Sequence, residues 1–78
     1  MARFHITIES SDLVISDPAG LELPDAEAAC REAINGGAEI VADELKRGAN
    51  SVDVNLHIDD HDGSRIKTVR ISASINFE

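Results

Sequence analysis

The stretch that decides the fold is SVDVNLHID, residues 51–59, in which apolar and polar side chains alternate without interruption. The aliphatic residues share one parity: Val52, Val54, Leu56 and Ile58. The polar residues share the other: Asp53, Asn55, His57 and Asp59. Because successive side chains of a strand point to opposite faces of a sheet, this period of two predicts a half-buried β-strand.

The residues that follow predict a hairpin. DHDG, residues 60–63, contains the Asp-Gly pair that is typical of tight turns between strands. The alternation then resumes in SRIKTVRISASINF, residues 64–77, and continues to Phe77. Ile66 has the opposite parity, which predicts a bulge near Lys67 or a strand that begins only at about Thr68.

On the N-terminal side of these strands lies a helix, predicted from Asp25 to about Arg47. Asp25 is a suitable N-cap, because its carboxylate can accept hydrogen bonds from the free amides of the first turn. Gly48 can adopt the left-handed conformation that ends many helices. Small or apolar residues recur at steps of three and four, which is the period of one helical face: Ala26, Ala29, Cys30, Ala33, Ile34, Gly37, Val41 and Leu45.

Gly36 and Gly37 interrupt this helical pattern, since each glycine costs about 1 kcal/mol relative to alanine in a helix interior. They either let the helix lie very close to a sheet or to another helix, or they mark a kink or a break. The apolar face keeps its phase across them, which favours one continuous helix.

The N-terminal third predicts two more strands. RFHITIE, residues 3–9, alternates like a half-buried strand, and LVIS, residues 13–16, forms a second short strand. DPAG, residues 17–20, predicts a β-turn. The order strand, strand, helix, strand, strand over residues 1–78 predicts a single α+β domain, with one long helix packed on one face of a four-stranded, mainly antiparallel sheet.

Composition limits the class of function. The 78 residues carry a formal net charge of -8, which disfavours direct binding to nucleic acid or to anionic lipid. No long apolar run and no secretory signal pattern is visible, so we expect a cytoplasmic protein without membrane association. The lone Cys30 excludes an intrachain disulfide, and its apolar helical face predicts a buried structural thiol.

The segment with the most potential chemistry is HIDDHDGS, residues 57–64. It does not match an EF-hand loop, because a glycine at position six would place Ile58 and Val69 at two ligand positions. We expect a solvated hairpin turn, no cofactor, no metal and no enzymatic activity. The alternative is an enzyme, or a protein that binds a metal or a small ligand, using His5, His57 and Asp59 on the open face of the sheet.

The acidic residues of the helix form a further candidate surface. Glu32, Glu39 and Asp43 share one face of the helix, roughly opposite the apolar one. We expect a non-catalytic protein-interaction or regulatory module, and these residues, with His57 and Arg70 of the open sheet face, could meet a basic protein partner. An acidic inhibitor that imitates nucleic acid is another alternative.

The small aliphatic core predicts a homodimer. Phe4 and Phe77 are the only aromatic residues, and a core of this size leaves roughly 3–5 kcal/mol of stability. Two surfaces could form the contact: the polar open face of the sheet, or an edge strand, for which the strand at residues 3–9 and the last strand are candidates. The edge is favoured, because desolvating Asp53, His57 and Arg70 on the open face would cost more than pairing backbone groups. A close helix-to-helix contact at Gly36 and Gly37 is the alternative.

The run DPAGLELPDAEAACREA, residues 17–33, resembles a family of small bacterial proteins that is known only as a domain of unknown function. The shared pattern is Asp, two residues and Gly, followed by Glu, an apolar residue and an Asp that enters an Ala-rich helix. The positions that carry it are Asp17, Gly20, Glu22, Leu23, Asp25, Ala28, Ala29 and Ala33, and Asp60 and Gly63 resemble the family's Asp-x-x-Gly hairpin. The resemblance implies no activity and no catalytic residues.

Overall fold

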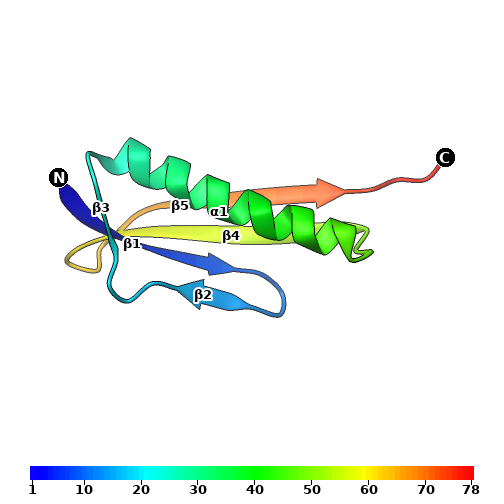
Figure 1. Ribbon diagram of the computed structural model, residues 1–78, viewed down its shortest axis with the longest axis horizontal. Coiled ribbons are helices and arrows are strands. Elements are labelled where there is room, and N and C mark those ends of the chain that lie inside the picture. Colours follow the sequence, from blue (N-terminus) through cyan, green and yellow to red (C-terminus); the bar gives the residue numbers. More distant parts are fainter.

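A computed structural model describes all 78 residues, and it has two layers: one helix lies across one face of a sheet (Figure 1). The chain forms six elements, in the order β1 (Ala2–Glu9), β2 (Val14–Ser16), β3 (Leu21–Leu23), α1 (Ala26–Lys46), β4 (Ser51–Asp60) and β5 (Arg65–Ser74). The α+β class and the single helix predicted from the sequence are confirmed.

The sheet is antiparallel throughout and has the strand order β2-β1-β4-β5. It contains five strands, not the four predicted, because β3 also pairs with β1. β2 pairs with the second half of β1 and β3 pairs with the first half. The sequence did not reveal β3, because its strand character depends on pairing with β1 and not on a local pattern.

Two turns with the same sequence pattern, Asp-x-x-Gly, connect strands in this sheet. In each, the Asp carboxylate accepts from the backbone N–H two residues later: Ala19 N to Asp17 Oδ1 (3.0 Å), and Asp62 N to Asp60 Oδ1 (2.9 Å). In each, the final glycine has a positive φ, 77° at Gly20 and 86° at Gly63, which other residues adopt only with strain. The pattern noted in the sequence is therefore a structural device.

Helix α1 begins and ends as predicted. The Asp25 carboxylate accepts a 2.9 Å hydrogen bond from Ala28 N, and the helix continues without a break through both glycines. A Cβ built on Gly37 would lie 2.7 Å from Leu56 Cδ2, so the glycine allows α1 to approach β4 very closely. Of the alternatives open at the sequence level, close packing of the helix on the sheet is the one observed.

The core lies between α1 and the centre of the sheet and is small. Eight hydrophobic residues are buried: Phe4, Ala29, Ala33, Val41, Val52, Val54, Leu56 and Ile58. All four aliphatic residues of the alternating stretch in β4 belong to this set, which confirms that β4 is the central strand. On the helix the buried side chains are alanines and one valine, so most of the core volume comes from the sheet.

The last strand contains the expected bulge and ends earlier than expected. Ile58 pairs with Lys67 and Asp59 pairs with Arg65, so Ile66 is the extra residue. Strand β5 ends at Ser74, which pairs with Ser51, the first residue of β4. Beyond this point β4 offers no partner, and one further hydrogen bond, from Ile75 N to Asn50 O (2.7 Å), holds the chain.

One prediction about the sheet edges was wrong. The strand at residues 3–9 is not an edge, because β1 pairs with β4 on one side and with β2 and β3 on the other. The edge that remains continuous over many residues is β5. This difference determines where a partner strand has room to bind.

Candidate protein-interaction edge

Strand β5 presents the long free edge of the sheet. It pairs with β4 from Arg65 to Ser74, and no strand lies on its other side. In an antiparallel ladder every second residue directs its N–H and C=O away from the existing partner. The ten residues of β5 therefore offer unpaired donors and acceptors along one line, which is a template for an additional strand.

An apolar groove accompanies this edge where α1 passes over β5. The groove has a volume of about 650 Å³, and it is lined by Ala26, Glu27, Cys30, Ile34, Ile66, Lys67 and Val69. Ile34 and Ile66 are large side chains that remain 42% and 41% exposed. Aliphatic side chains held partly in water beside unpaired backbone groups form a surface that a partner could cover.

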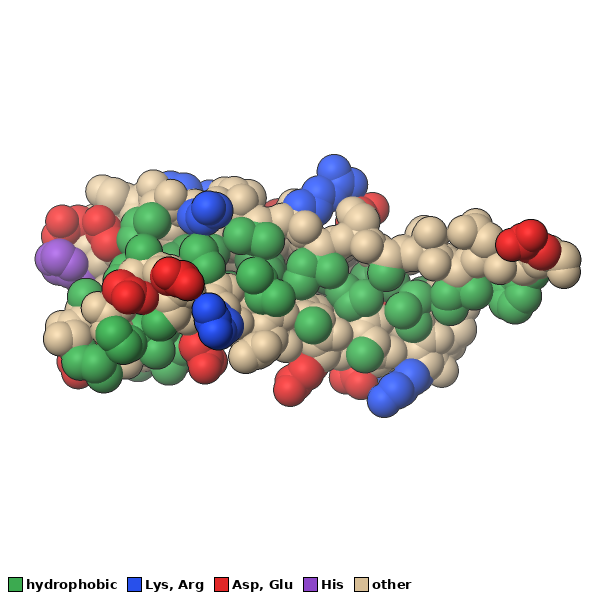
Figure 2. All heavy atoms as spheres, turned by 90° about the horizontal axis from the view of Figure 1, so that it is seen from above, with side chains coloured by type: hydrophobic (Ala, Val, Ile, Leu, Met, Phe, Trp, Pro, Cys, Tyr) green, Lys and Arg blue, Asp and Glu red, His purple; other side chains and the backbone are tan.

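Figure 2 shows this edge directly, and hydrophobic side chains follow one another along it to the C-terminal end of the molecule. Near that end lie Ile75 and Phe77, which follow β5. Phe77 is 85% exposed, although it is one of only two aromatic residues in the chain. The tail, which continues from the end of β5, thus carries the largest exposed apolar side chain of the protein.

Two of the three cations of β5, Arg65 and Arg70, form ion pairs within the chain. Arg70 Nη2 lies 3.1 Å from Asp53 Oδ1, and Arg65 forms an ion pair with Asp59. Lys67 lines the groove and takes part in no ion pair, while Glu27, which also lines it, is paired with Arg31. The edge therefore does not carry a strong uncompensated positive charge.

Asp53 has the one clearly shifted pKa in the protein. Ser72 Oγ donates a 2.6 Å hydrogen bond to Asp53 Oδ1, and this bond is the main reason that the pKa of the carboxyl lies below its ordinary value. A hydrogen bond from Arg70 and its positive charge lower the pKa further. The pair of strands β4 and β5 is therefore tied together on the open face by side chains as well as by backbone.

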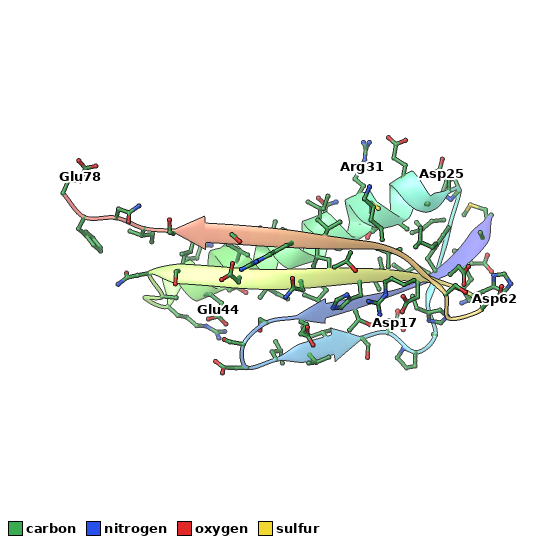
Figure 3. The ribbon with its side chains drawn as sticks, turned by 180° about the vertical axis from the view of Figure 1, so that it is seen from behind. Asp17, Asp25, Arg31, Glu44, Asp62 and Glu78 are labelled. Carbon is green, nitrogen blue, oxygen red and sulfur yellow. The ribbon has the colours of Figure 1, made fainter.

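The open face of the sheet, on the side away from α1, is polar (Figure 3). Its centre is His57, whose Nδ1 accepts a 2.9 Å hydrogen bond from Arg65 Nη1 and lies 3.4 Å from Thr68 Oγ1. On its other side, His57 Nε2 lies 3.6 Å from Glu9 Oε1. The ring is thus surrounded by side chains from β1 and β5.

The three residues considered for a metal or ligand site face different neighbours. His5 Nδ1 lies 3.4 Å from the carbonyl oxygen of Asp17, and Asp59 is paired with Arg65. His5 is directly opposite Asp59 in the ladder, while His57 is opposite Thr7. No group of three or more His, Cys, Asp or Glu side chains in the structure is placed to hold a metal ion.

The acidic residues of the helix, Glu32, Glu39 and Asp43, are all exposed, as expected for one outward face of α1. None of the three takes part in an ion pair within the subunit. They lie on α1, apart from Arg70 and His57 on the open face of the sheet, so the five residues proposed as one interaction surface are divided between two layers.

Cys30 differs from its prediction. It is half-buried and lines the groove beside Ile34, whereas a fully buried thiol was expected. The sheet does not extend far enough beyond β5 to cover this part of the helix. Sequence reasoning also missed the groove, although the opposite parity of Ile66 was a signal that one large side chain would not fit the core.

These features define a class: a small α+β protein with a single helix on an antiparallel sheet and one long uncovered edge. The chain belongs to the domain of unknown function DUF6894, whose family model matches residues 3–72. The resemblance seen in the sequence to a family of unknown function is thereby confirmed. The match ends two residues before β5 ends, so the tail that carries Ile75 and Phe77 lies outside it.

Searches of curated proteins and of solved structures find no significant match. The structure contains no helix with the combination of length and apolar character needed to cross a bilayer.

Proposed function

We propose that this protein is a non-catalytic interaction module that binds an extended segment of a partner as an additional strand on β5. The observation that carries the proposal is the coincidence of a ten-residue free strand edge with an apolar groove alongside it. Backbone hydrogen bonds to such an edge provide affinity, and side-chain pockets on alternate residues provide specificity.

The groove sets the chemistry of the partner segment. An added strand places every second side chain on the helix side of the sheet, where Ile34, Ile66 and Val69 would contact it. The other side chains would continue the polar open face, next to Arg70 and Ser72. The fitting ligand is therefore an extended peptide in which aliphatic or aromatic residues alternate with small polar ones.

The proposal includes a cytoplasmic location. The free Cys30 supports this, because proteins of oxidising compartments commonly hold their cysteines in disulfides.

A peptide titration tests the binding mode. The probe is a synthetic peptide of alternating valine and serine, blocked at both ends, added to the ¹⁵N-labelled protein at low micromolar concentration. We expect amide shift changes in β5 and in the part of α1 that lines the groove. Changes confined to the exposed acidic face of α1, or no changes at all, would contradict strand addition.

Two matched variants locate the contact. Ile66→Asp places a charge in the groove wall and is expected to weaken peptide binding about tenfold or more, since it removes a contact between apolar side chains. Leu13→Asp is the control, because Leu13 is similarly exposed at 47% but lies in the loop before β2, at the far edge of the sheet. Equal weakening by both variants would show that the peptide does not bind at the groove.

A further inference from the structure

We infer that the segment bound on β5 is the β5 and C-terminal tail of a second copy of this chain, paired antiparallel across a two-fold axis at Ala73. This inference rests on the proposed function and names its partner. It concerns residues 69–77, which contain the regular half of β5 and the tail beyond it.

The register follows from the side chains. With Ala73 opposite Ala73 of the second copy, the smallest apolar side chain of the strand lies on the axis. The apolar positions then face one another: Ile71 is opposite Ile75 of the second copy, and Val69 is opposite Phe77 of the second copy. On the open face, Ser72 is opposite Ser74 of the second copy and Arg70 is opposite Asn76 of the second copy.

Charge and bulge oppose the symmetric registers whose two-fold axis lies closer to the N-terminus of β5. An axis at Ile71 would place Lys67 opposite Ile75 of the second copy and would carry the pairing towards the bulge at Ile66. A bulge and an inward-facing lysine are devices that commonly prevent edge pairing. They occupy the first part of β5 only, which leaves the part from Val69 onwards free to pair.

Pairing with a second copy also accounts for the strand-like alternation of residues 75–77. Residues 75–77 keep the alternation of a strand, yet β4 begins at Ser51 and cannot pair with them. An antiparallel second copy supplies the missing neighbour for this segment. Val69 lines the groove, so Phe77 of the second copy would cover the groove at that end, next to the exposed Ile34.

The available area fits a reversible dimer. Nine residues of strand extend about 30 Å, and the molecule is 16 Å thick across its two layers. This edge therefore offers at most roughly 500 Å² per copy, because the tail extends past the end of α1 (Figure 1), and a pair of copies buries at most about 1,000 Å², which is the size of a weak, reversible interface. The small core of the single subunit makes this additional burial important for stability.

Sedimentation equilibrium on the full chain over a wide concentration range tests the second copy as the partner. We expect a reversible dimer, and Phe77→Asp should raise its dissociation constant about tenfold or more. Val14→Asp is the control, because Val14 is also well exposed, at 62%, but lies on β2 at the opposite edge. A dimer that is insensitive to Phe77→Asp, or one that is weakened equally by Val14→Asp, overturns the inference.

A cysteine cross-link tests the register. In a Cys30→Ala background, Ala73→Cys should form a disulfide between copies under mild oxidation, since residues directly opposite one another have Cβ atoms about 4.5–5.5 Å apart. Ser74→Cys should cross-link much more slowly, because its counterpart in the second copy is displaced along the strand. Equal rates overturn the axis at Ala73.

The experiments test the binding mode and the identity of the partner separately. If the wild-type protein is strictly monomeric at high micromolar concentration while the valine-serine peptide still binds β5, the second copy is not the partner and strand addition stands. If the protein is monomeric and the peptide does not bind, both the partner and the binding mode are wrong.

Discussion

Gly37 on α1 and Leu56 on β4 are packed so closely that a Cβ on the glycine would stand 2.7 Å from the leucine Cδ2. Leu56 is fully buried, and Ile71 Cδ1 lies 3.1 Å from the same position. The absence of a side chain at Gly37 therefore allows α1 to pack this closely on the sheet.

Gly37→Ala should destabilise the protein. The added methyl group gains about 1 kcal/mol of helix propensity, but overpacking a closed core costs about 1–3 kcal/mol. We expect a net loss of up to about 2 kcal/mol in the free energy of unfolding, measured by urea denaturation.

The adjacent glycine provides the control. Gly36→Ala would meet only Ile8 Cδ1 at 3.1 Å, and Ile8 is half-buried and can move. This variant should be neutral or more stable by up to about 1 kcal/mol. Equal destabilisation by both substitutions would show that the helix tolerates neither methyl group and that contact with Leu56 is not decisive.

The two Asp-x-x-Gly turns should respond differently to alanine. Gly63→Ala forces a positive φ on alanine at an open site and should cost about 1–2 kcal/mol. Gly20→Ala carries the same strain and also places a Cβ 2.9 Å from the carbonyl oxygen of Phe4. Thermal unfolding of both variants should show the larger loss for Gly20→Ala, and the reverse order would contradict this packing.

The N-cap of α1 can be tested with a conservative pair. Asp25→Ala removes the acceptor for Ala28 N and should cost about 1 kcal/mol of stability. Asp25→Asn keeps a side-chain oxygen at the same place and should retain most of this stability. Chemical denaturation of both variants measures the difference, and an Asn variant as unstable as the Ala variant would mean that the cap bond matters little.

The lowered pKa of Asp53 predicts how the stability of the protein depends on pH. Since its pKa in the folded protein lies below the ordinary value of 3.8, its contribution to stability is complete above that value and is lost as the pH falls through the folded-state pKa. Ser72→Ala should raise the pKa of Asp53, because Ser72 supplies the main hydrogen bond. A carboxyl ¹³C titration by NMR measures this change.

Ser16→Ala is the matched control for that titration, because Ser16 lies on β2 and is not bonded to Asp53. The pKa of Asp53 should be the same in this variant as in the wild type. If Ser72→Ala leaves the titration unchanged, the hydrogen bond does not control the carboxyl group in solution.

The sequence predicted the elements whose local signals agree with their packing. Residues 51–59 alternate because one face of β4 is buried, and Asp25 and Gly48 mark the helix ends through local hydrogen bonds and backbone conformation. The sequence did not predict β3, and it left two candidates for the free edge, because both features depend on which strands become neighbours. Leu21 and Leu23 are recognisable as a strand only once β1 is placed beside them.

The candidate site was less predictable than the fold. The edge consists of backbone groups whose exposure depends on strand order, and a residue pattern does not encode them. The last strand was a candidate, but the strand at residues 3–9 was an equal one until the positions of β2 and β3 were known. The polar residues that attracted attention, such as His57, form contacts between strands.

The turn from Asp17 to Gly20 has a consequence for solubility. It separates β2 from β3, so the side of the sheet beyond β1 is bordered by two strands of only three residues each. Long, flat, exposed strand edges favour the addition of further strands and the growth of fibrils. An assembly of this chain that covers β5 has only these short, divided edges left, and edges of this kind oppose further growth of the sheet.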